Sequence, residues 1–402
     1  MAKYKISRHV GTAAIEGYFN EEIPEKYRGL FVLNHDAKKI EYVINETIKF
    51  YLDKFSEPKA PEDVTREVET EVKSKSPEVE ATCKRFFAYL LKRRILVREN
   101  EQEILADDIA SYQKGELIDD LCIEEIISEN DYIEIYSATR INDETKYIVK
   151  LLHRKKVPSR SEFDKELIEL EKEFELLEKV RDIPYISRVY QFNKRENEYA
   201  YFTLEYIEGK SLSKFLSSEE ALTEEDTIKL IYGILQAFSL LHQHEVIHGD
   251  IHSSNLLISA NKEIKVIDLG LSPNVKNENN QVLKFGGVDF YMPPERINIS
   301  STKKFSREPD YYSDVYQIGL LMYLVLYNTL PFTGFTWEEL AVNIKETAPE
   351  CPAFTFLGQP VPYYVTDMVK RCLSKNPAAR YANAAEILAD FQKYVLHKKE
   401  LV

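Results

Sequence analysis

The chain has 402 residues, of which 44% are hydrophobic and 30% are charged, and this balance argues against wholesale disorder. The length is sufficient for two or three domains with a sizeable core. The net charge of -14 argues against non-specific binding to nucleic acid or to anionic membranes, so neither partner is expected.

The cysteines and the apolar runs of the sequence indicate the cellular compartment in which the protein is expected. Four cysteines, Cys83, Cys122, Cys351 and Cys372, lack metal-like spacing, which indicates free thiols in a reducing environment. The N-terminal residues contain no apolar run typical of a signal peptide. The longest apolar run, Ile318–Tyr327, is too short to span a bilayer and predicts a buried core helix. We therefore expect a cytoplasmic protein without a membrane span.

Residues 1–100 predict a small winged-helix-like α+β domain. Residues 29–33 and 40–44 have strand composition and are separated by a polar turn. Asn45 is placed to cap a helix, and Pro61 begins a second one. A third helix carries apolar residues at helical spacing, namely Val79, Cys83, Phe86, Phe87, Leu90 and Leu91. Residues 95–97 then predict a returning strand.

This order of elements resembles the PqqD-like peptide-recognition family over roughly residues 25–100. The resemblance rests on Val32-Leu33-Asn34 before the first helix and on the apolar positions from Phe86 to Ile95. It implies a domain that presents a strand edge and a helix to the leader segment of a peptide substrate. A generic winged helix that packs on the rest of the protein explains the same pattern. A DNA-binding winged helix needs a basic recognition helix, whereas the second helix carries Glu67, Glu69 and Glu71.

Residues 101–122 are acidic and predict a linker. Beyond them the order is strands, a long charged helix, more strands and then helices. This order predicts a smaller lobe over residues 123–208 and a larger, helical lobe over residues 209–397.

A lysine inside an apolar strand needs a partner, because burying an unpaired ammonium is costly. Lys150 occupies such a strand, predicted over residues 146–152. The helix predicted from Ser161 to Val180 offers Glu173, although Glu173 has several acidic neighbours and could be one surface charge among many.

Two polar loops carry the strongest chemical signal. The run His248-Gly249-Asp250-Ile251-His252-Ser253-Ser254-Asn255 precedes Asp268-Leu269-Gly270. Phosphoryl transfer needs one carboxylate to orient the attacking hydroxyl, and an Asn and an Asp to hold Mg²⁺ on the phosphates. Asp250, Asn255 and Asp268 have these types in this order. The apolar residues 245–247 and 264–267 predict short strands that place both loops at one edge of a cleft.

These loops, together with Lys150 and Glu173, resemble the protein kinase family, and the resemblance covers about two-thirds of the chain. It implies a two-lobed α+β fold, with ATP and Mg²⁺ as cofactors and a protein or peptide as substrate. The implied catalytic set is Asp250, Lys150, Glu173, Asn255 and Asp268, with Asn255 and Asp268 as the metal ligands.

The resemblance also implies an adenine pocket. Residues 201–209 are similar to the strand and hinge that receive the base, with Leu204 beside the back pocket and the backbone of Glu205 and Ile207 on the base edge. Leu257 would form the apolar floor, and Lys150 would reach the phosphates. The pocket is completed by Ile127, Ile135 and Ile148, and Ile148 stands where the family usually has a small alanine.

Two later segments follow in family order. Gly286–Glu295 is similar to the end of an activation segment, whose glutamate pairs with a late arginine, and Arg380 fits that partner. Residues 313–319 are similar to the start of a buried helix whose aspartate, Asp314, holds the backbone of the loop His248–Asn255, called the catalytic loop below.

The chain departs from the family most clearly at the phosphate loop. Ser128, Asn130 and Ile133 stand at the three glycine positions, where side chains should hinder the approach of the backbone to phosphate. Nearby acidic residues, Glu129, Asp131 and Glu134, are expected to add negative charge there. Further departures are Gly249 in place of an arginine, His252 in place of a lysine, Leu269 in place of a phenylalanine, and Val288 in place of a threonine.

The sequence favours an ATP-dependent phosphotransferase of the protein-kinase fold that transfers the γ-phosphate to a hydroxyl, with Ser/Thr as the favoured acceptors. The glycine-free loop leaves open a pseudokinase that serves as a binding or scaffold protein. His252 and Val288 leave open a small-molecule kinase, although Pro293-Pro294-Glu295 and Asp314 argue against it.

Overall fold

The computed structural model describes residues 3–8, 10–14, 30–35, 40–72, 77–92, 95–99, 110–129, 132–157, 159–216, 222–269, 289–297, 309–333 and 337–400. The chain separates into two compact units. The first is built mainly from Met1–Ala110, and the second from Ser111–Gln281 and Gly287–Val402. In the described part of the chain, no helix combines the length and apolar character needed to cross a bilayer.

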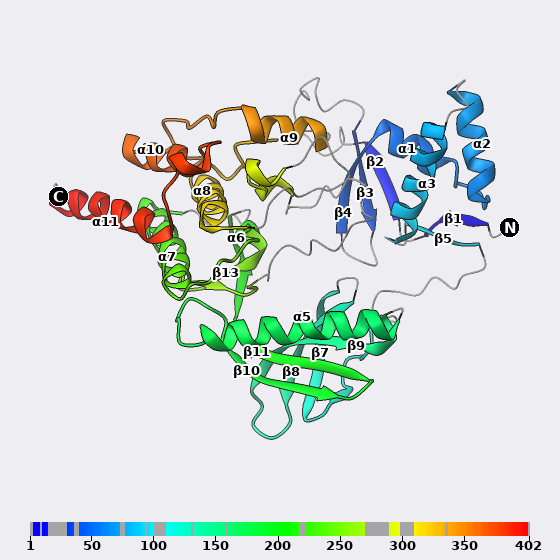
Figure 1. Ribbon diagram of the computed structural model, residues 1–402, viewed down its shortest axis with the longest axis horizontal. Helices are drawn as coiled ribbons and strands as arrows, with labels where there is room; N and C mark the ends of the chain where they lie inside the picture. Colours follow the sequence, from blue (N-terminus) through cyan, green and yellow to red (C-terminus); the bar gives the residue numbers. More distant parts are fainter. Residues whose placement is uncertain are drawn as a thin grey trace. The chain divides into compact units, whose positions relative to one another are not determined.

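The N-terminal unit is a small α+β structure. Its three-stranded antiparallel sheet has the order β2 (Val10–Ala14), β3 (Leu30–His35), β4 (Ile40–Asn45). The helices α1 (Glu46–Asp53), α2 (Pro61–Glu71) and α3 (Pro77–Lys92) follow (Figure 1). A separate strand pair joins β1 (Tyr4–Ile6) to β5 (Leu96–Arg98).

Local sequence accounts for these elements. Pro61 occupies the first position of α2, where its missing N–H costs nothing, and Glu62 and Asp63 complement the helix dipole. Val64 and Val68 of α2 are buried against α1 and α3, in a core completed by Ile48, Tyr51, Leu52, Phe55, Cys83 and Leu90. The predicted strands around residues 29–33, 40–44 and 95–97 and the three helices are confirmed, whereas the sequence analysis missed β1 and β2.

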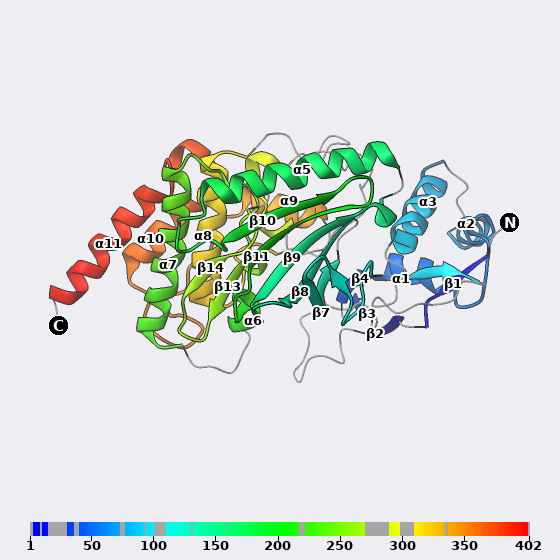
Figure 2. The same cartoon turned by 90° about the horizontal axis from the view of Figure 1, so that it is seen from below.

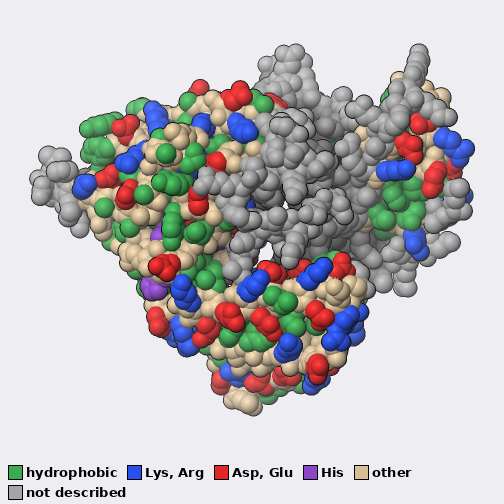
Figure 3. All heavy atoms as spheres, in the orientation of Figure 1, with side chains coloured by type: hydrophobic (Ala, Val, Ile, Leu, Met, Phe, Trp, Pro, Cys, Tyr) green, Lys and Arg blue, Asp and Glu red, His purple; other side chains and the backbone are tan. Residues whose placement is uncertain are grey.

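The second unit begins with a six-stranded antiparallel sheet in the order β10-β11-β9-β8-β7-β6. Its strands are β6 (Leu117–Ile118), β7 (Leu121–Glu129), β8 (Ile133–Arg140), β9 (Lys146–His153), β10 (Val189–Arg195) and β11 (Tyr199–Glu205). Helix α5 (Arg160–Lys179) runs across this sheet and contacts β9, β10 and β11 (Figure 1). The sheet starts at Leu117, within the range predicted as a linker. Acidic and basic side chains are mixed on the face of this lobe seen in Figure 3.

The rest of the unit is mainly helical. Helix α8 (Tyr311–Tyr327) is buried from Ser313 to Tyr327, which confirms the predicted core helix. It packs against α7 (Glu224–Gln243), α10 (Tyr363–Cys372) and α11 (Ala384–Glu400), as Figure 2 shows. The shorter elements are α6 (Leu212–Leu216), α9 (Trp337–Glu346) and the sheet of β12 (Gly209–Ser211), β13 (Leu256–Ser259) and β14 (Ile264–Val266).

The prediction of a strand over residues 245–247 is wrong. Glu245 has a φ of 58°, a left-handed conformation that ends α7 rather than continuing into an extended run. Val246 is nevertheless buried, so the apolar signal came from core packing and not from strand pairing. The companion strand is confirmed as β14, which pairs with β13.

Candidate active site

Lys150 lies in β9 and points toward two carboxylates. Its Nζ is 2.5 Å from Oε1 of Glu173 on α5 and 3.6 Å from Oδ1 of Asp268, which follows β14. The side chains of Lys150 and Glu173 are each only 12% exposed. The structure therefore brings together three of the predicted site residues, and the predicted pairing of Lys150 with Glu173 is confirmed.

Helix α5 positions Glu173 through its own pattern. Ser159 caps the helix by accepting a hydrogen bond from the backbone N–H of Glu162. Leu170 and Leu177, three residues before and four residues after Glu173, are buried, so all three side chains lie on the inner face of the helix. The spacing that fixes the helix in the core thus also directs this glutamate inward.

The electrostatics of the three groups follow from burial and mutual attraction. Burial favours the neutral amine of Lys150, but the carboxylates of Glu173 and Asp268 outweigh it and raise the pKa of Lys150. Burial raises the pKa of Glu173 to about 7. The nearby Asp268 also acts to raise this pKa, whereas Lys150 acts to lower it. Burial also acts to raise the pKa of Asp268, but Lys150 and His248 hold it below its ordinary value. The lysine is therefore a cation at neutral pH, with the ionised Asp268 beside it.

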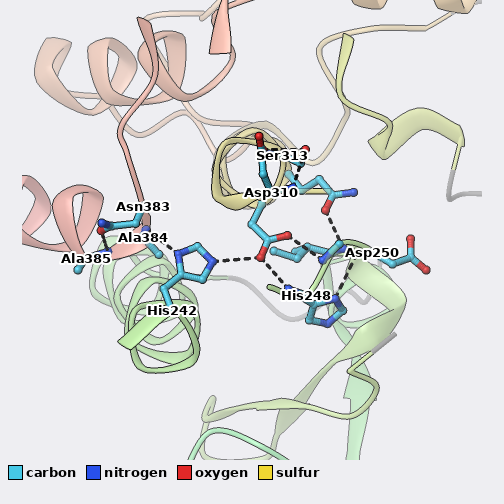
Figure 4. Close-up of polar contacts among 12 residues, drawn as sticks. His242, His248, Asp250, Asp310, Ser313, Asn383, Ala384 and Ala385 are labelled. Carbon is cyan, nitrogen blue, oxygen red and sulfur yellow. Dashed lines mark hydrogen bonds and ion pairs between the residues drawn. The ribbon is translucent and has the colours of Figure 1, made fainter. Parts of the chain in front are cut away.

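The loop that carries Asp250 is held from α8. Oδ2 and Oδ1 of Asp314 accept hydrogen bonds from the backbone N–H groups of His248 and Gly249, each at 2.8 Å. Oδ2 also lies 3.0 Å from Nε2 of His242 on α7, and the contacts to His242 and His248 can be followed in Figure 4. The predicted anchoring of this loop by Asp314 is confirmed.

The start of α8 is itself fixed by a capping box. Asp310 accepts a hydrogen bond from the N–H of Ser313, whose Oγ accepts one from the N–H of Asp310 (Figure 4). The carboxylate of Asp314 is fully buried one residue further on. A buried charge of this kind requires donors, and the two loop N–H groups provide them.

Asn255 is placed beside Asp250 and Asp268 by backbone and side-chain bonds. The side-chain Nδ2 of Asn255 donates to the backbone carbonyl oxygen of Asp250 at 3.2 Å. The backbone carbonyl oxygen of Asn255 accepts a hydrogen bond from the N–H of Ile267 at 3.0 Å. The second bond ties Asn255 to the residue before Asp268. The side chain of Asp250 is 37% exposed, and its Oδ2 lies 3.8 Å from Nε2 of His252.

The donor set fits a magnesium ion better than a softer metal. Oδ1 of Asp268 is buried and accepts no hydrogen bond from the described residues. Asn255 uses its amide nitrogen as a donor, and its amide oxygen is the atom type that could serve as a metal ligand. Mg²⁺ prefers oxygen ligands and is held by few carboxylates together with substrate phosphates and water. Within the described ranges, no three His, Cys, Asp or Glu side chains are grouped so that they could hold a metal alone.

Strand register places three of the predicted pocket residues on the same sheet face as Lys150. Ile135 of β8 lies opposite Lys150, and Ile148 of β9 lies opposite Leu204 of β11. Residues 148 and 150 alternate with Val149, so their side chains share one face. This apolar row is where an adenine could pack.

The remaining predicted pocket residues are less enclosed. The N–H of Glu205 is used by the carbonyl of Arg188, so only its carbonyl could meet a base edge. The carboxylate of Glu205 pairs with Lys265, a contact that the sequence analysis missed. Ile207 and Leu257 are half-buried, and Ile127 is 51% exposed at a bulge in β7.

The phosphate-loop positions are largely in strands. Ser128 of β7 lies opposite Ile135, and Ile133 begins β8. The expectation that Glu134 adds charge near the phosphates is wrong, because it faces away from Lys150, is fully buried, and binds Lys156 and the N–H of Ser111. Asn130, Asp131 and the side chain of Glu129 lie outside the described residues.

The end of the predicted activation segment is held by a confirmed pair. Arg380 forms a two-pronged ion pair with Glu295 at 2.8 and 2.7 Å, and its own side chain is fully buried. Gly286, Gly287 and Val288 lie outside the described residues. The sequence analysis missed Gln317 and Arg296, which both contact the catalytic loop. The signal for Gln317 was its polar side chain within the apolar residues of α8, whereas Arg296, next to Glu295, offered no comparable signal.

Comparison with known proteins agrees with this geometry. The protein kinase domain family matches residues 123–391. The chain is 30% identical over 213 residues to the serine/threonine-protein kinase PknB of Mycobacterium tuberculosis, covering 52% of this chain and 33% of that protein. It is 27% identical over 215 residues to the serine/threonine-protein kinase PrkC of Bacillus subtilis, covering 52% and 31%. The chain thus spans about a third of the length of these curated relatives.

Proposed function

The chain belongs to the protein kinase domain family, and on that premise we propose that it transfers the γ-phosphate of ATP to a hydroxyl of a protein or peptide, with Ser or Thr as acceptor. The observation that carries the proposal is the buried contact of Lys150 with Glu173, with Asp268 beside it. A buried ammonium–carboxylate pair is costly to form, and a lysine that must be held ready to bind phosphate explains why Lys150 and Glu173 are buried together.

Each site residue has one role in this proposal. Lys150 clamps the α- and β-phosphates, and Glu173 holds the lysine in that position. Asp250 accepts the proton of the attacking hydroxyl, for which its partly exposed carboxylate is accessible. Positioning and charge neutralisation carry phosphoryl transfer, so the loss of any of these groups removes transition-state stabilisation.

Asn255 and Asp268 are the residues that would hold Mg²⁺. When bound, the ion neutralises negative charge on the phosphates. Lys150 then keeps Asp268 ionised and oriented, and Asp250 fixes the amide of Asn255 through its carbonyl oxygen. The apolar row of Ile135, Ile148 and Leu204 would receive the base, with Ile127, Ile207 and Leu257 at its margins.

The first test is thermal melting with and without Mg·ATP, for the wild type and for Asp268→Ala. Ligand at 100 times its Kd stabilises a protein by ~2.7 kcal/mol, so we expect a metal-dependent shift in the wild type that the variant loses. Labelled-phosphate transfer is then measured for the wild type and for Asp268→Asn, which should fold but not turn over. Retained turnover in Asp268→Asn contradicts the assignment of roles.

One observation favours a second candidate function. Ser128 and Ile133 carry side chains where close approach to phosphate is expected, which is the pattern of a pseudokinase that binds partners without catalysis. Nucleotide binding without transfer, or no melting shift at millimolar Mg·ATP, would favour this reading over the enzyme.

We further propose that the N-terminal unit captures the leader segment of a peptide substrate. The outer strands of its sheet, β2 and β4, each have one side without a partner strand among the described residues, as required for the addition of a peptide strand. Tethering would raise the effective concentration of the peptide at the kinase lobes. Deletion of residues 1–100 should raise KM for the native substrate while sparing self-phosphorylation, and an unchanged KM contradicts this part of the proposal.

A further inference from the structure

The carbonyl and N–H groups around Asp250 are held by more than the aspartate of α8. Gly249 has a φ of +74°, and a Cβ there would lie 2.9 Å from Cγ of Pro309. A side chain at this position would therefore be strained by the backbone conformation and crowded by Pro309. Gly249, directly before Asp250, has no side chain, so the orientation of its peptide groups depends on the groups that bind its N–H and its carbonyl.

Arg296 binds that carbonyl. Its Nη1 donates to the oxygen of Gly249 at 3.0 Å, and the residue is only 3% exposed. The N–H of the same glycine is bound by Oδ1 of Asp314. Gly249 is therefore held at its N–H from α8 and at its carbonyl from the segment Asp289–Ile297, which contains the end of the predicted activation segment.

Gln317 ties the same two segments together from α8. Its Oε1 accepts from the N–H of Ile251 at 3.0 Å, and its Nε2 donates to the carbonyl of Tyr291 at 3.2 Å. The residue is 3% exposed and lies in α8, which is buried from Ser313 to Tyr327. One amide thus binds the residue after Asp250 and the segment Asp289–Ile297 at once.

Tyr291 adds a side-chain contact between these segments. The residue is 4% exposed, and its ring lies 6.0 Å from the ring of His252, two residues after Asp250. The segment Asp289–Ile297 therefore contacts the catalytic loop directly at Gly249 and His252. It is also linked to Ile251 through Gln317. None of these contacts uses a phosphate group.

We propose that Gln317 and Arg296 are positioning residues that lock the catalytic loop to the segment Asp289–Ile297 without phosphorylation of the protein. The lock fixes Asp250 from the residues on either side of it, Gly249 and Ile251. This inference rests on the proposed kinase function, because it assigns the means by which the same site is kept assembled. Its donors and acceptors are an amide, a guanidinium and backbone groups, all present in the unmodified chain.

The test compares Gln317→Leu, which removes both hydrogen bonds, with Gln317→Glu, which keeps an acceptor for Ile251 but loses the donor to Tyr291. Gln236→Glu is the matched control, because Gln236 donates to the hydroxyl of Tyr232, four residues earlier on the same helix α7. We expect kcat to fall on the order of tenfold to hundredfold in Gln317→Leu and less in Gln317→Glu, with KM for ATP nearly unchanged. The control should match the wild type.

Hydrogen exchange provides a readout that does not depend on turnover. The peptide that covers residues 248–252 should exchange faster in Gln317→Leu and in Arg296→Lys than in the wild type or the control. Phosphatase treatment of the purified wild type should leave kcat unchanged. If Gln317→Leu fails to fold, Gln317→Glu and Arg296→Lys carry the same comparison.

The outcomes separate this inference from the proposed function. Unchanged exchange and kcat in folded Gln317→Leu overturn the lock, and so does loss of wild-type activity after phosphatase treatment. Absence of transfer by the wild type overturns the proposed enzyme, whereas faster exchange at residues 248–252 in the variants still supports the lock as a structural device.

Discussion

The catalytic loop and the β7–β8 strand pair are both expected to face the nucleotide, but their backbones are arranged differently. In the loop, buried side chains from α8 and from the segment Asp289–Ile297 bind the backbone on both sides of Asp250. In the strand pair, residues with side chains occupy the positions where free backbone is expected, and Ser128 is paired with Ile135. The comparison teaches that phosphate binding here would depend on the positive charge of Lys150 and on a metal ion held by Asp268, rather than on a cradle of backbone N–H groups.

The largest expected effect comes from removing the charge on which that conclusion depends. Lys150→Met leaves the buried Glu173 without its cation, and breaking a buried pair costs about 3–5 kcal/mol of unfolding free energy. We expect transfer to be lost and the Mg·ATP melting shift to disappear. Lys146→Met is the control, since that lysine lies at the exposed end of the same strand and pairs with Glu124. Wild-type turnover in Lys150→Met would contradict the conclusion that phosphate binding depends on the charge of Lys150.

The next effect tests the anchoring of the catalytic loop. Asp314→Asn keeps the shape of the side chain but replaces one acceptor oxygen with a donor that faces a backbone N–H or His242. An unsatisfied buried group costs about 1–3 kcal/mol, and more when a charged acceptor is lost, so urea unfolding should show a fall of about 2–4 kcal/mol. Asp143→Asn is the control, because Asp143 accepts the N–H of Thr145 at an exposed turn. Equal stabilities for Asp314→Asn and the wild type contradict the anchoring role.

The sequence predicted much of the chemistry because the relevant side chains are spaced by local structure. The position of Glu173 between Leu170 and Leu177 follows from helical periodicity, and its pairing with Lys150 follows from the cost of a buried ammonium. Likewise, the buried helix of Ile318 is evident from its apolar run. In each case, a few neighbouring residues determine the answer.

Long-range polar contacts could not be predicted in this way. Gln317 and Arg296 bind backbone groups about 66 and 47 residues away, and no local pattern specifies such partners. Glu134 is a different case, since strict strand alternation with Ile133 and Ile135 would have placed it on the face opposite Lys150. The error came from reading the strand positions as a loop, where side-chain direction is not determined by alternation.

The smallest effect probes the strand pair directly. Ser128→Gly removes a side chain from the sheet face that Ile135 and Lys150 share, so phosphate could approach β7 more closely. The strand should lose roughly 0.5–1 kcal/mol of stability, because glycine has more freedom in the unfolded chain. The Kd for Mg·ATP, measured by calorimetry, should tighten about three- to tenfold, equivalent to roughly 0.7–1.4 kcal/mol.

The control for this prediction is Glu125→Gly, an exposed position on the same strand that lies opposite Ser137. It should lose stability to a similar extent without a change in Kd. If Ser128→Gly binds nucleotide no more tightly than the wild type, the side chain does not obstruct the phosphates. The nucleotide would then already be held at a distance from β7 by Lys150 and by the metal ion that Asp268 would bind, and the absence of glycine would have no consequence for binding.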